Sequence, residues 1–343
     1  TRALSTVSFR SLIMAETGWS EAEVSKKQNY GIDIGLFNSL TLSLDYFKER
    51  VDNMVVQAVA RIPAYQGVPL GNYPKTNVGK FENHGVDLTL GFTKQINTDW
   101  RVFAYGTFTW ADNKVIDVAE AIKDEGYVYR HRTEGFPVGT QFGYVTDGYY
   151  NTQEELDAAP EHSFGTPRLG DLKYLDLNGD GKITEADRTM IGNPTPDFTY
   201  GYSVNLQYKN FDLGIDFQGV YGNEIFNTSF LSAYAQYNYH TKRLGRWNGE
   251  GTSNWEPILD SSRATQMMNS SYFIEDGSYL RLKNIQLGYS FGDRILKKIR
   301  LKALRVFMNI DNLATWSHNT GYTPEIGGTA LAFGIDTGDT YPM

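Results

Sequence analysis

The sequence contains no cysteine and no long apolar run, and these two absences exclude several kinds of protein. Without cysteine the chain can form no disulfide, no thiolate metal site and no cysteine nucleophile. No stretch reaches the roughly 18 to 20 apolar residues that a membrane-spanning helix requires. A membrane protein is still allowed, because barrel strands of about 10 alternating residues leave hydropathy low.

Positive charge is also scarce. The chain has 32 Lys and Arg against 40 Asp and Glu, which gives a net charge of -8 at pH 7. Proteins that bind nucleic acid neutralise phosphates with clustered Lys and Arg, and no basic patch stands out in this sequence. We therefore expect no nucleic-acid partner.

Aromatic residues, glycine and alternating hydropathy are what the sequence has in abundance. Its 23 Tyr, 19 Phe and 34 Gly are typical of a chain with many strands. Apolar and polar residues alternate in four pairs of segments, which predicts four antiparallel hairpins. The hairpins cover residues 30–46, 86–110, 200–217 and 285–310.

Short turns within the hairpins alternate with long connections between them. The gaps near 52–84, 116–197, 227–278 and 317–343 each take roughly 30 to 80 residues, far more than an ordinary loop. In an up-and-down sheet this places every short turn at one end. The pattern predicts an all-β fold, part of a large antiparallel up-and-down transmembrane β-barrel with short periplasmic turns and long extracellular loops.

The two faces of the predicted strands support the same fold. Aromatic residues beside the short turns match an interfacial girdle, and they are Phe37, Trp100, Tyr208, Phe211 and Phe291. Polar residues expected to line a wet lumen are Asp33, Asp87, Asp212, Asp216 and Gln218. The pattern alone leaves a soluble β-sandwich open, although the very long loops count against it.

Residues 176–187, DLNGDGKITEAD, have the spacing of a calcium loop. The candidate metal ligands are Asp176, Asn178, Asp180, the carbonyl of Lys182, and Asp187 at the twelfth position. The twelfth residue of an EF-hand is Glu, so dockerin-like loops are the nearer comparison. The alternative is a metal-free loop held by Asx-turns. If Ca²⁺ binds, we expect it to stiffen a long extracellular loop.

A long loop between Phe226 and Trp255 is rich in aromatic rings. We interpret Tyr237, Tyr239 and Trp247 as candidate contacts for a substrate or a lid, while the alternative is that these rings pack the loop on itself or on a neighbouring subunit. The five histidines are scattered and match no catalytic or metal-ligand spacing. We predict that the protein is not an enzyme.

Several segments are familiar in their order and spacing. They include QNYGIDIGLFNSLTLSLDYF at 28–47, NVGKFENHGVDLTLGF at 77–92, FPVGTQFGYVTDGYYNTQEE at 136–155, DGSYLRLKNIQLGYSF at 276–291 and LRVFMNIDNLATWS at 304–317. Together they resemble the C-terminal barrel part of SusC/RagA-family TonB-dependent transporters. The resemblance implies the Gram-negative outer membrane and a plugged barrel of about 22 strands.

The resemblance also implies a function and partners. It points to TonB-dependent import of oligosaccharides, with a SusD-like surface lipoprotein as a lid, TonB acting on the plug side, and outer-membrane lipid around the barrel. A peptide importer of the same family stays open, as do a passive porin and a soluble calcium-binding β-sandwich module.

The extent of the chain leads to a further expectation. Residues 1–343 would form the C-terminal part of the receptor barrel, with the plug, the N-terminal extension, the early strands and the closing strand outside them. Other strands must then close the sheet, because each unpaired edge group in lipid costs several kcal/mol.

Overall fold

The structure is a computed structural model, and the chain in it divides into two compact units. The described residues are 4–13, 23–56, 76–118, 134–228, 241–253, 256–259, 268–327 and 333–337. The first unit takes residues 1–119, 196–223 and 277–318, and the second takes 120–195, 224–276 and 319–343. Each unit is therefore assembled from segments that lie far apart in the sequence.

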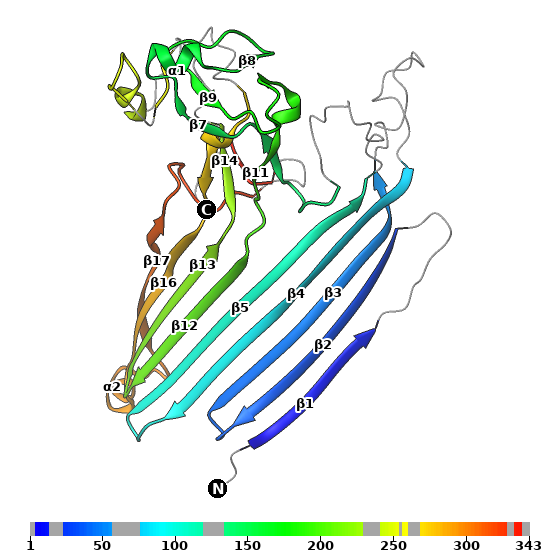
Figure 1. Cartoon of the computed structure of the whole chain (residues 1–343). Helices are drawn as coiled ribbons and strands as arrows, with labels where there is room; N and C mark the ends of the chain where they lie inside the picture. Colours follow the sequence, from blue (N-terminus) through cyan, green and yellow to red (C-terminus); the bar gives the residue numbers. More distant parts are fainter. Residues whose placement is uncertain are drawn as a thin grey trace. The chain divides into compact units, whose positions relative to one another are not determined.

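The first unit is a single antiparallel sheet of nine strands in the order β1-β2-β3-β4-β5-β12-β13-β16-β17 (Figure 1). The strands are β1 (Leu4–Ile13), β2 (Val24–Leu36), β3 (Leu40–Val56), β4 (Thr76–Gln95), β5 (Trp100–Asp117), β12 (Phe198–Tyr208), β13 (Phe211–Tyr221), β16 (Tyr279–Ser290) and β17 (Arg305–Ser317). Neighbours in the sheet follow chain order, as in an up-and-down plan. The four predicted hairpins are confirmed as β2–β3, β4–β5, β12–β13 and β16–β17.

Strand β1 is an addition to the predicted sheet. The alternation rule finds eight strands and misses this one, because Ser11 interrupts one row of β1 and Leu12 adds an apolar residue to the other. The register pairs Val7 with Ile34 and Phe9 with Ile32, so β1 continues the alternation of its neighbour. Pairing with β2 therefore identifies a strand that local pattern does not.

Strands β3, β4 and β5 run past the limits set by apolar alternation. Their extensions carry charged side chains that pair across strands, Lys48 with Glu82 at 3.0 Å and Lys80 with Asp117 at 3.9 Å. Lys80 and Asp117 are direct register partners, whereas Lys48 reaches Glu82 diagonally, and opposite charges in either arrangement stabilise the pairing. The gap predicted between residues 52 and 84 is thus partly strand.

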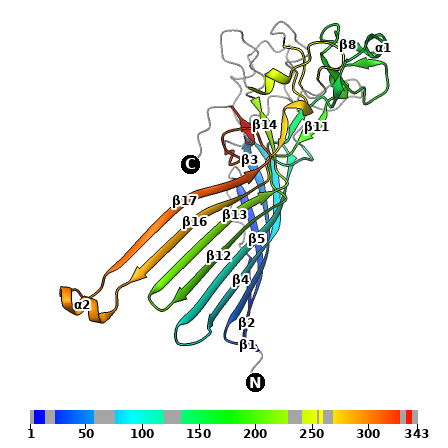
Figure 2. The same ribbon diagram turned by 90° about the vertical axis from the view of Figure 1, so that its left-hand side faces the viewer.

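All the short turns lie at one end of the sheet, as predicted (Figures 1 and 2). In the β2–β3 turn both Phe37 and Asn38 have φ of 53°, and Ser39 N donates to Leu36 O at 3.0 Å. Two successive residues with positive φ make a type I′ turn, whose twist matches that of the strands. The β16–β17 turn is longer and holds helix α2 (Asp293–Ile299), which Figure 2 shows at the tip of that hairpin.

The second unit consists of short strands around small aromatic cores. Its elements are β6 (Gln141–Gly143), β7 (Thr146–Tyr149), α1 (Gln153–Asp157), β8 (Glu161–His162), β9 (Leu172–Tyr174), β10 (Lys182–Ile183), β11 (Thr189–Gly192), β14 (Glu224–Asn227), β15 (Ile274–Asp276) and β18 (Ile335–Asp336). One core contains Tyr144, Tyr149, Leu172, Tyr174 and Ile183. No helix in the described part of the chain is long and apolar enough to cross a membrane.

Candidate functional site

One face of the nine-stranded sheet is apolar and is bordered by two rows of aromatic rings. Near the short turns, the rings of Trp100 and Tyr208 lie 4.5 Å apart and those of Phe211 and Tyr289 lie 4.7 Å apart. Towards the other end, Trp110 and Phe198 are register partners. The predicted girdle beside the short turns is therefore present, and a second one lies further along the strands.

The spacing of the two rows matches a membrane. Trp100 and Trp110 are ten residues apart on β5, which corresponds to about 33 Å along the strand. A strand tilted by about 40° then spans about 25 Å, which is the height of the apolar band of an outer-membrane barrel. Large apolar side chains between the rows remain exposed, among them Leu44, Leu90 and Tyr202 at 40%, 44% and 40%. A sandwich would cover such a face, whereas lipid covers it in a barrel.

The opposite face is polar, as the alternation predicts, and its side chains bond to one another across strands. Ser43 Oγ donates to Asp33 Oδ1 at 2.7 Å, and Thr109 Oγ1 donates to Asp87 Oδ1 at 2.6 Å. The predicted luminal residues Asp212, Asp216 and Gln218 alternate on β13 on this same face. The structure thus brings five predicted luminal side chains to one side of the sheet.

The polar face continues across β16 and β17 as a network of amides and carboxylates. Asn284 Nδ2 donates to Asn309 Oδ1 at 2.6 Å and to Asp311 Oδ1 at 2.8 Å. Arg305 Nε donates to Asp212 Oδ1 at 3.2 Å. Alternation places Asn284, Asn309 and Asp311 on the polar face, but it does not show which of these side chains meet across the two strands.

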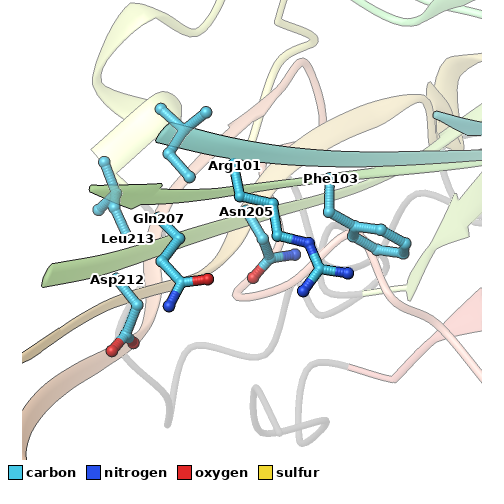
Figure 3. A pocket seen from close by; sticks show the side chains of 7 residues that line it. Arg101, Phe103, Asn205, Gln207, Asp212 and Leu213 are labelled. Atoms are coloured by element: carbon cyan, nitrogen blue, oxygen red, sulfur yellow. The ribbon is translucent and has the colours of Figure 1, made fainter. Parts of the chain in front are cut away.

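A hollow of about 350 Å³ lies on this face near the short turns. It is lined by Arg101, Phe103, Asn205, Leu206, Gln207, Asp212 and Leu213. Figure 3 shows Arg101, Phe103, Asn205, Gln207 and Asp212 on one side of the strands, with Leu213 directed to the other. The hollow combines an exposed aromatic ring with amides, a guanidinium and a carboxylate. Sequence reasoning did not single out Arg101 or Phe103, although extending the alternation of β12 to its partner β5 would have found them.

In the second unit, the predicted calcium loop is closed by its own backbone hydrogen bonds. Asp176 accepts from Gly179 N and Gly181 N, each at 2.7 Å, and Asp180 Oδ1 accepts from Lys182 N at 2.8 Å. Asp187 is fully buried and accepts from Leu177 N at 2.9 Å and Thr184 N at 2.8 Å.

These contacts fit Asx-turns and also place the candidate ligands around one loop. Partial desolvation acts to raise the pKa of Asp176, but the amides of Gly181 and Gly179 outweigh it and hold that pKa below its usual range. No group of three or more His, Cys, Asp or Glu side chains in the described ranges is arranged to hold a metal. Calcium binding at residues 176–187 stays a prediction.

Of the three aromatic contact candidates, only Trp247 falls within the described residues, and Tyr237 and Tyr239 lie outside them. The Trp247 ring packs on Gly170, where an added Cβ would lie 2.5 Å from a ring carbon. Trp247 N also donates to Glu256 O at 2.9 Å. The ring is thus held by its own unit, and its role towards a substrate or a lid stays a prediction.

A buried ion pair, which sequence reasoning missed, joins the same loop to the chain near residue 272. Glu256 is fully buried and pairs with Arg243, and it accepts a hydrogen bond from Tyr272 Oη at 3.0 Å. Burial, reinforced by Glu256, raises the pKa of Tyr272 far above its ordinary value. No sequence signal marks this cluster, because its members are separated along the chain and follow no periodic pattern.

Taken together, an apolar face with two aromatic girdles and a polar opposite face define a segment of a transmembrane β-barrel. The sequence matches the family described as "TonB dependent receptor-like, beta-barrel" over residues 20–216. The chain belongs to this family of Gram-negative outer-membrane receptors. The family consists of transporters and not of enzymes, which agrees with the prediction of no catalysis.

Relatives and solved structures agree with this assignment. The chain is 30% identical to TonB-dependent receptor P3 of Formosa agariphila, covering 88% of this chain and 30% of that protein. It is 26% identical to TonB-dependent receptor SusC of Bacteroides thetaiotaomicron, covering 87% and 29%. The fold matches the RagAB peptide importer in its closed-closed state with a TM-score of 0.72 at 19% identity, covering all of this chain and 40% of that one. The chain therefore spans about a third of the length of its curated relatives, and the SusC/RagA resemblance is confirmed.

Proposed function

We propose that the protein containing this chain imports oligosaccharides across the outer membrane, driven by TonB and assisted by a SusD-like surface lipoprotein. The observation that carries the proposal is the chemistry of the polar face around the hollow. Phe103 offers an aromatic face, and Asn205 and Gln207 offer amides that both donate and accept hydrogen bonds. Sugars present hydroxyl groups at their rims and apolar C–H faces, and this set of side chains suits both.

Membership of the receptor family supports the TonB dependence, and the resemblance to the SusC/RagA family supports a SusD-like lipoprotein partner. In the second unit, Leu244 and Tyr322 are 81% and 78% exposed, and such apolar side chains suit a protein partner. Tyr237, Tyr239 and Trp247 are further candidates for contact with the lid or the cargo. Ca²⁺ bound at residues 176–187 would stiffen this loop of the second unit, to which the lipoprotein lid would dock.

Uptake by whole cells tests the proposal. The full-length protein and its lipoprotein are expressed in a strain that lacks the native importer. Uptake of labelled neutral oligosaccharides is then measured with and without TonB. We expect uptake that requires TonB and that falls several-fold in Phe103→Ala and Asn205→Ala. Val102→Ala, the neighbour of Phe103 on the apolar face, is the matched control and should transport normally.

Other results identify the alternatives. Accumulation of labelled peptides in place of sugars would make the protein a peptide importer, the activity given for RagAB. Uptake that persists without TonB would make it a passive porin. If Phe103→Ala and Val102→Ala behave alike, the hollow has no part in binding cargo.

A further inference from the structure

The connection between β16 and β17 concentrates positive charge in a chain that is acidic overall. Residues 292–302 carry one acid, Asp293, and five bases: Arg294, Lys297, Lys298, Arg300 and Lys302. The chain as a whole has a net charge of -8, so the whole-chain balance conceals a local basic cluster. This corrects the expectation from composition that no basic patch is present.

The same segment exposes apolar side chains beside the bases. Ile295, Ile299 and Leu301 are 43%, 47% and 48% exposed, whereas Leu296 is 7% exposed. Ile295 and Ile299 are four residues apart in α2 and share one face of the helix. The Leu296 side chain is buried and anchors the helix, whereas the side chains of Ile295, Ile299 and Leu301 remain exposed.

The end of α2 fixes Leu301 next to the helix. Arg300 takes the left-handed conformation at φ 55°, and Leu301 N donates to Leu296 O at 3.0 Å. This is the hydrogen-bond pattern that closes helix C-termini. It turns the chain back so that Leu301 and Lys302 follow the helix closely, and the apolar and basic groups form one small surface.

The aromatic girdle shows at which depth of the membrane this surface lies. Phe291 directly precedes the turn, and its ring lies 5.1 Å from that of Tyr289, which is part of the girdle beside the short turns. Short turns of outer-membrane barrels lie on the periplasmic side. The segment therefore lies at the headgroup level of the periplasmic leaflet.

We propose that residues 293–302, the α2 surface, bind anionic phospholipid headgroups of the periplasmic leaflet. The five bases meet the phosphates, and Ile295, Ile299 and Leu301 enter the boundary between headgroups and acyl chains. Exposed apolar side chains combined with Lys and Arg in one short helical segment suit a lipid surface, because basic residues pair with anionic lipid while apolar ones insert. A soluble acidic partner would use the charges but would leave the three apolar residues without a function at this depth.

Lipid retention by the full-length protein tests the proposal directly. The protein is reconstituted in nanodiscs of phosphatidylcholine with a minor share of phosphatidylglycerol, and the retained lipids are counted by native mass spectrometry. The variant Lys297→Gln/Lys298→Gln/Lys302→Gln should lose preference for phosphatidylglycerol by about fivefold for each charge removed. A control with the same charge change in the second unit, Arg168→Gln/Lys173→Gln/Lys242→Gln, should keep it.

A label placed on the surface gives a second readout. This chain has no cysteine, so Ile295→Cys introduces a single thiol into it for an environment-sensitive dye. With the rest of the protein made cysteine-free, the dye should shift to the blue in anionic vesicles and be quenched by quenchers on lipid chains. A dye at Asp99→Cys, in the β4–β5 turn, should report water.

Three results would overturn the proposal. They are a dye at position 295 that stays in water, equal lipid retention by the two triple variants, and retention of soluble anionic cell-wall fragments in place of phospholipid. Heat-modified migration on gels confirms that each variant is folded. Transport is not measured, so failure here leaves the proposed import function untouched.

Discussion

Asp212 of β13 and Arg305 of β17 form an ion pair that passes over Gly288 of the intervening strand β16. Arg305 Nε lies 3.2 Å from Asp212 Oδ1, and the same guanidinium donates to Gln286 Oε1 at 3.1 Å. A Cβ added to Gly288 would lie 2.4 Å from an Asp212 carboxylate oxygen and 2.6 Å from an Arg305 nitrogen. Because Gly288 has no side chain, it leaves space for an ion pair between two strands that are not adjacent in the sheet.

Replacement of this glycine should separate the pair without unfolding the sheet. We expect Gly288→Ala to cost about 0.5 to 1 kcal/mol in free energy of unfolding, because partly exposed ion pairs contribute little and flexible side chains can move aside. Urea unfolding in lipid vesicles measures the change. In an Arg305→Ala background the cost of Gly288→Ala should vanish. Gly106→Ala, where the nearest atom lies at 3.9 Å, is the control, and an equal loss there would refute the role of Gly288.

The two faces of β12 predict opposite responses to charge. Val204 lies on the apolar face midway between the aromatic rows, and Asn205 lies on the polar face beside the hollow. Val204→Arg should cost about 2 to 4 kcal/mol, the penalty for Arg at the middle of the bilayer. Asn205→Arg should be nearly neutral. Folding yield and unfolding in vesicles distinguish the two, and similar losses would mean that β12 is not exposed to lipid.

The sequence predicts the sheet well because alternation reports which side of each strand meets lipid. Leu88, Leu90 and Phe92 stand out against Asp87 and Thr89 without any knowledge of their neighbours. The alternation fails where pairing rather than hydropathy defines a strand, as in β1 and in the charged extensions of β3, β4 and β5.

The chemistry of the site is less accessible from sequence. Asp212 and Arg305 are 93 residues apart, and Arg243, Glu256 and Tyr272 come together only through tertiary packing. The basic residues around α2 were visible in the sequence, but whole-chain charge obscured them. Register and long-range packing, which no local pattern encodes, account for the side-chain pairs and clusters that were missed.

The buried pair in the second unit should be costly to break from one side. Glu256→Ala leaves the Arg243 guanidinium buried without its carboxylate, and we expect a loss of about 3 to 5 kcal/mol in local stability. Hydrogen exchange of residues 144–150 and 268–276 measures this loss. The double variant Arg243→Met/Glu256→Met removes both charges and should recover most of the protection. A double variant as unstable as Glu256→Ala would show that packing, and not the uncompensated charge, dominates.

His162 gives the second unit a dependence on pH. The imidazole is 7% exposed, its Nε2 lies 3.2 Å from Tyr150 Oη, and burial lowers the pKa of His162 below 6.5. The unfolded chain therefore binds a proton first as pH falls. The stability that neutral His162 contributes is complete above pH 6.5 and is lost progressively as pH drops from 6.5 towards the lowered pKa.

Hydrogen exchange between pH 7.5 and 5 tests this dependence. Protection of residues 144–174, after correction for intrinsic exchange rates, should decline below pH 6.5 in the native protein. His162→Asn cannot titrate in this range and should show a flat profile, whatever its absolute stability. A decline of the same size in His162→Asn would assign the pH dependence to another group.

The loop at residues 176–187 is either a calcium site or a metal-free turn, and the two can be distinguished by experiment. Asp180 Oδ1 accepts from Lys182 N at 2.8 Å and Asp180 Oδ2 accepts from Asn178 Nδ2 at 3.0 Å, so its carboxylate shapes the loop with or without an ion. If residues 176–187 bind Ca²⁺, millimolar Ca²⁺ should increase the protease resistance of this loop, and Asp180→Ala should abolish the increase. The barrel should remain folded, because the loop belongs to the second unit and the sheet to the first. Glu185→Gln, an acid outside the predicted ligand set, should respond to Ca²⁺ like the native protein.

Two outcomes would contradict this prediction. Equal protease resistance with Ca²⁺ and with a chelator would mean that the loop is held by Asx-turns alone. Loss of the folded barrel in Asp180→Ala would show that the loop has a structural role in the sheet.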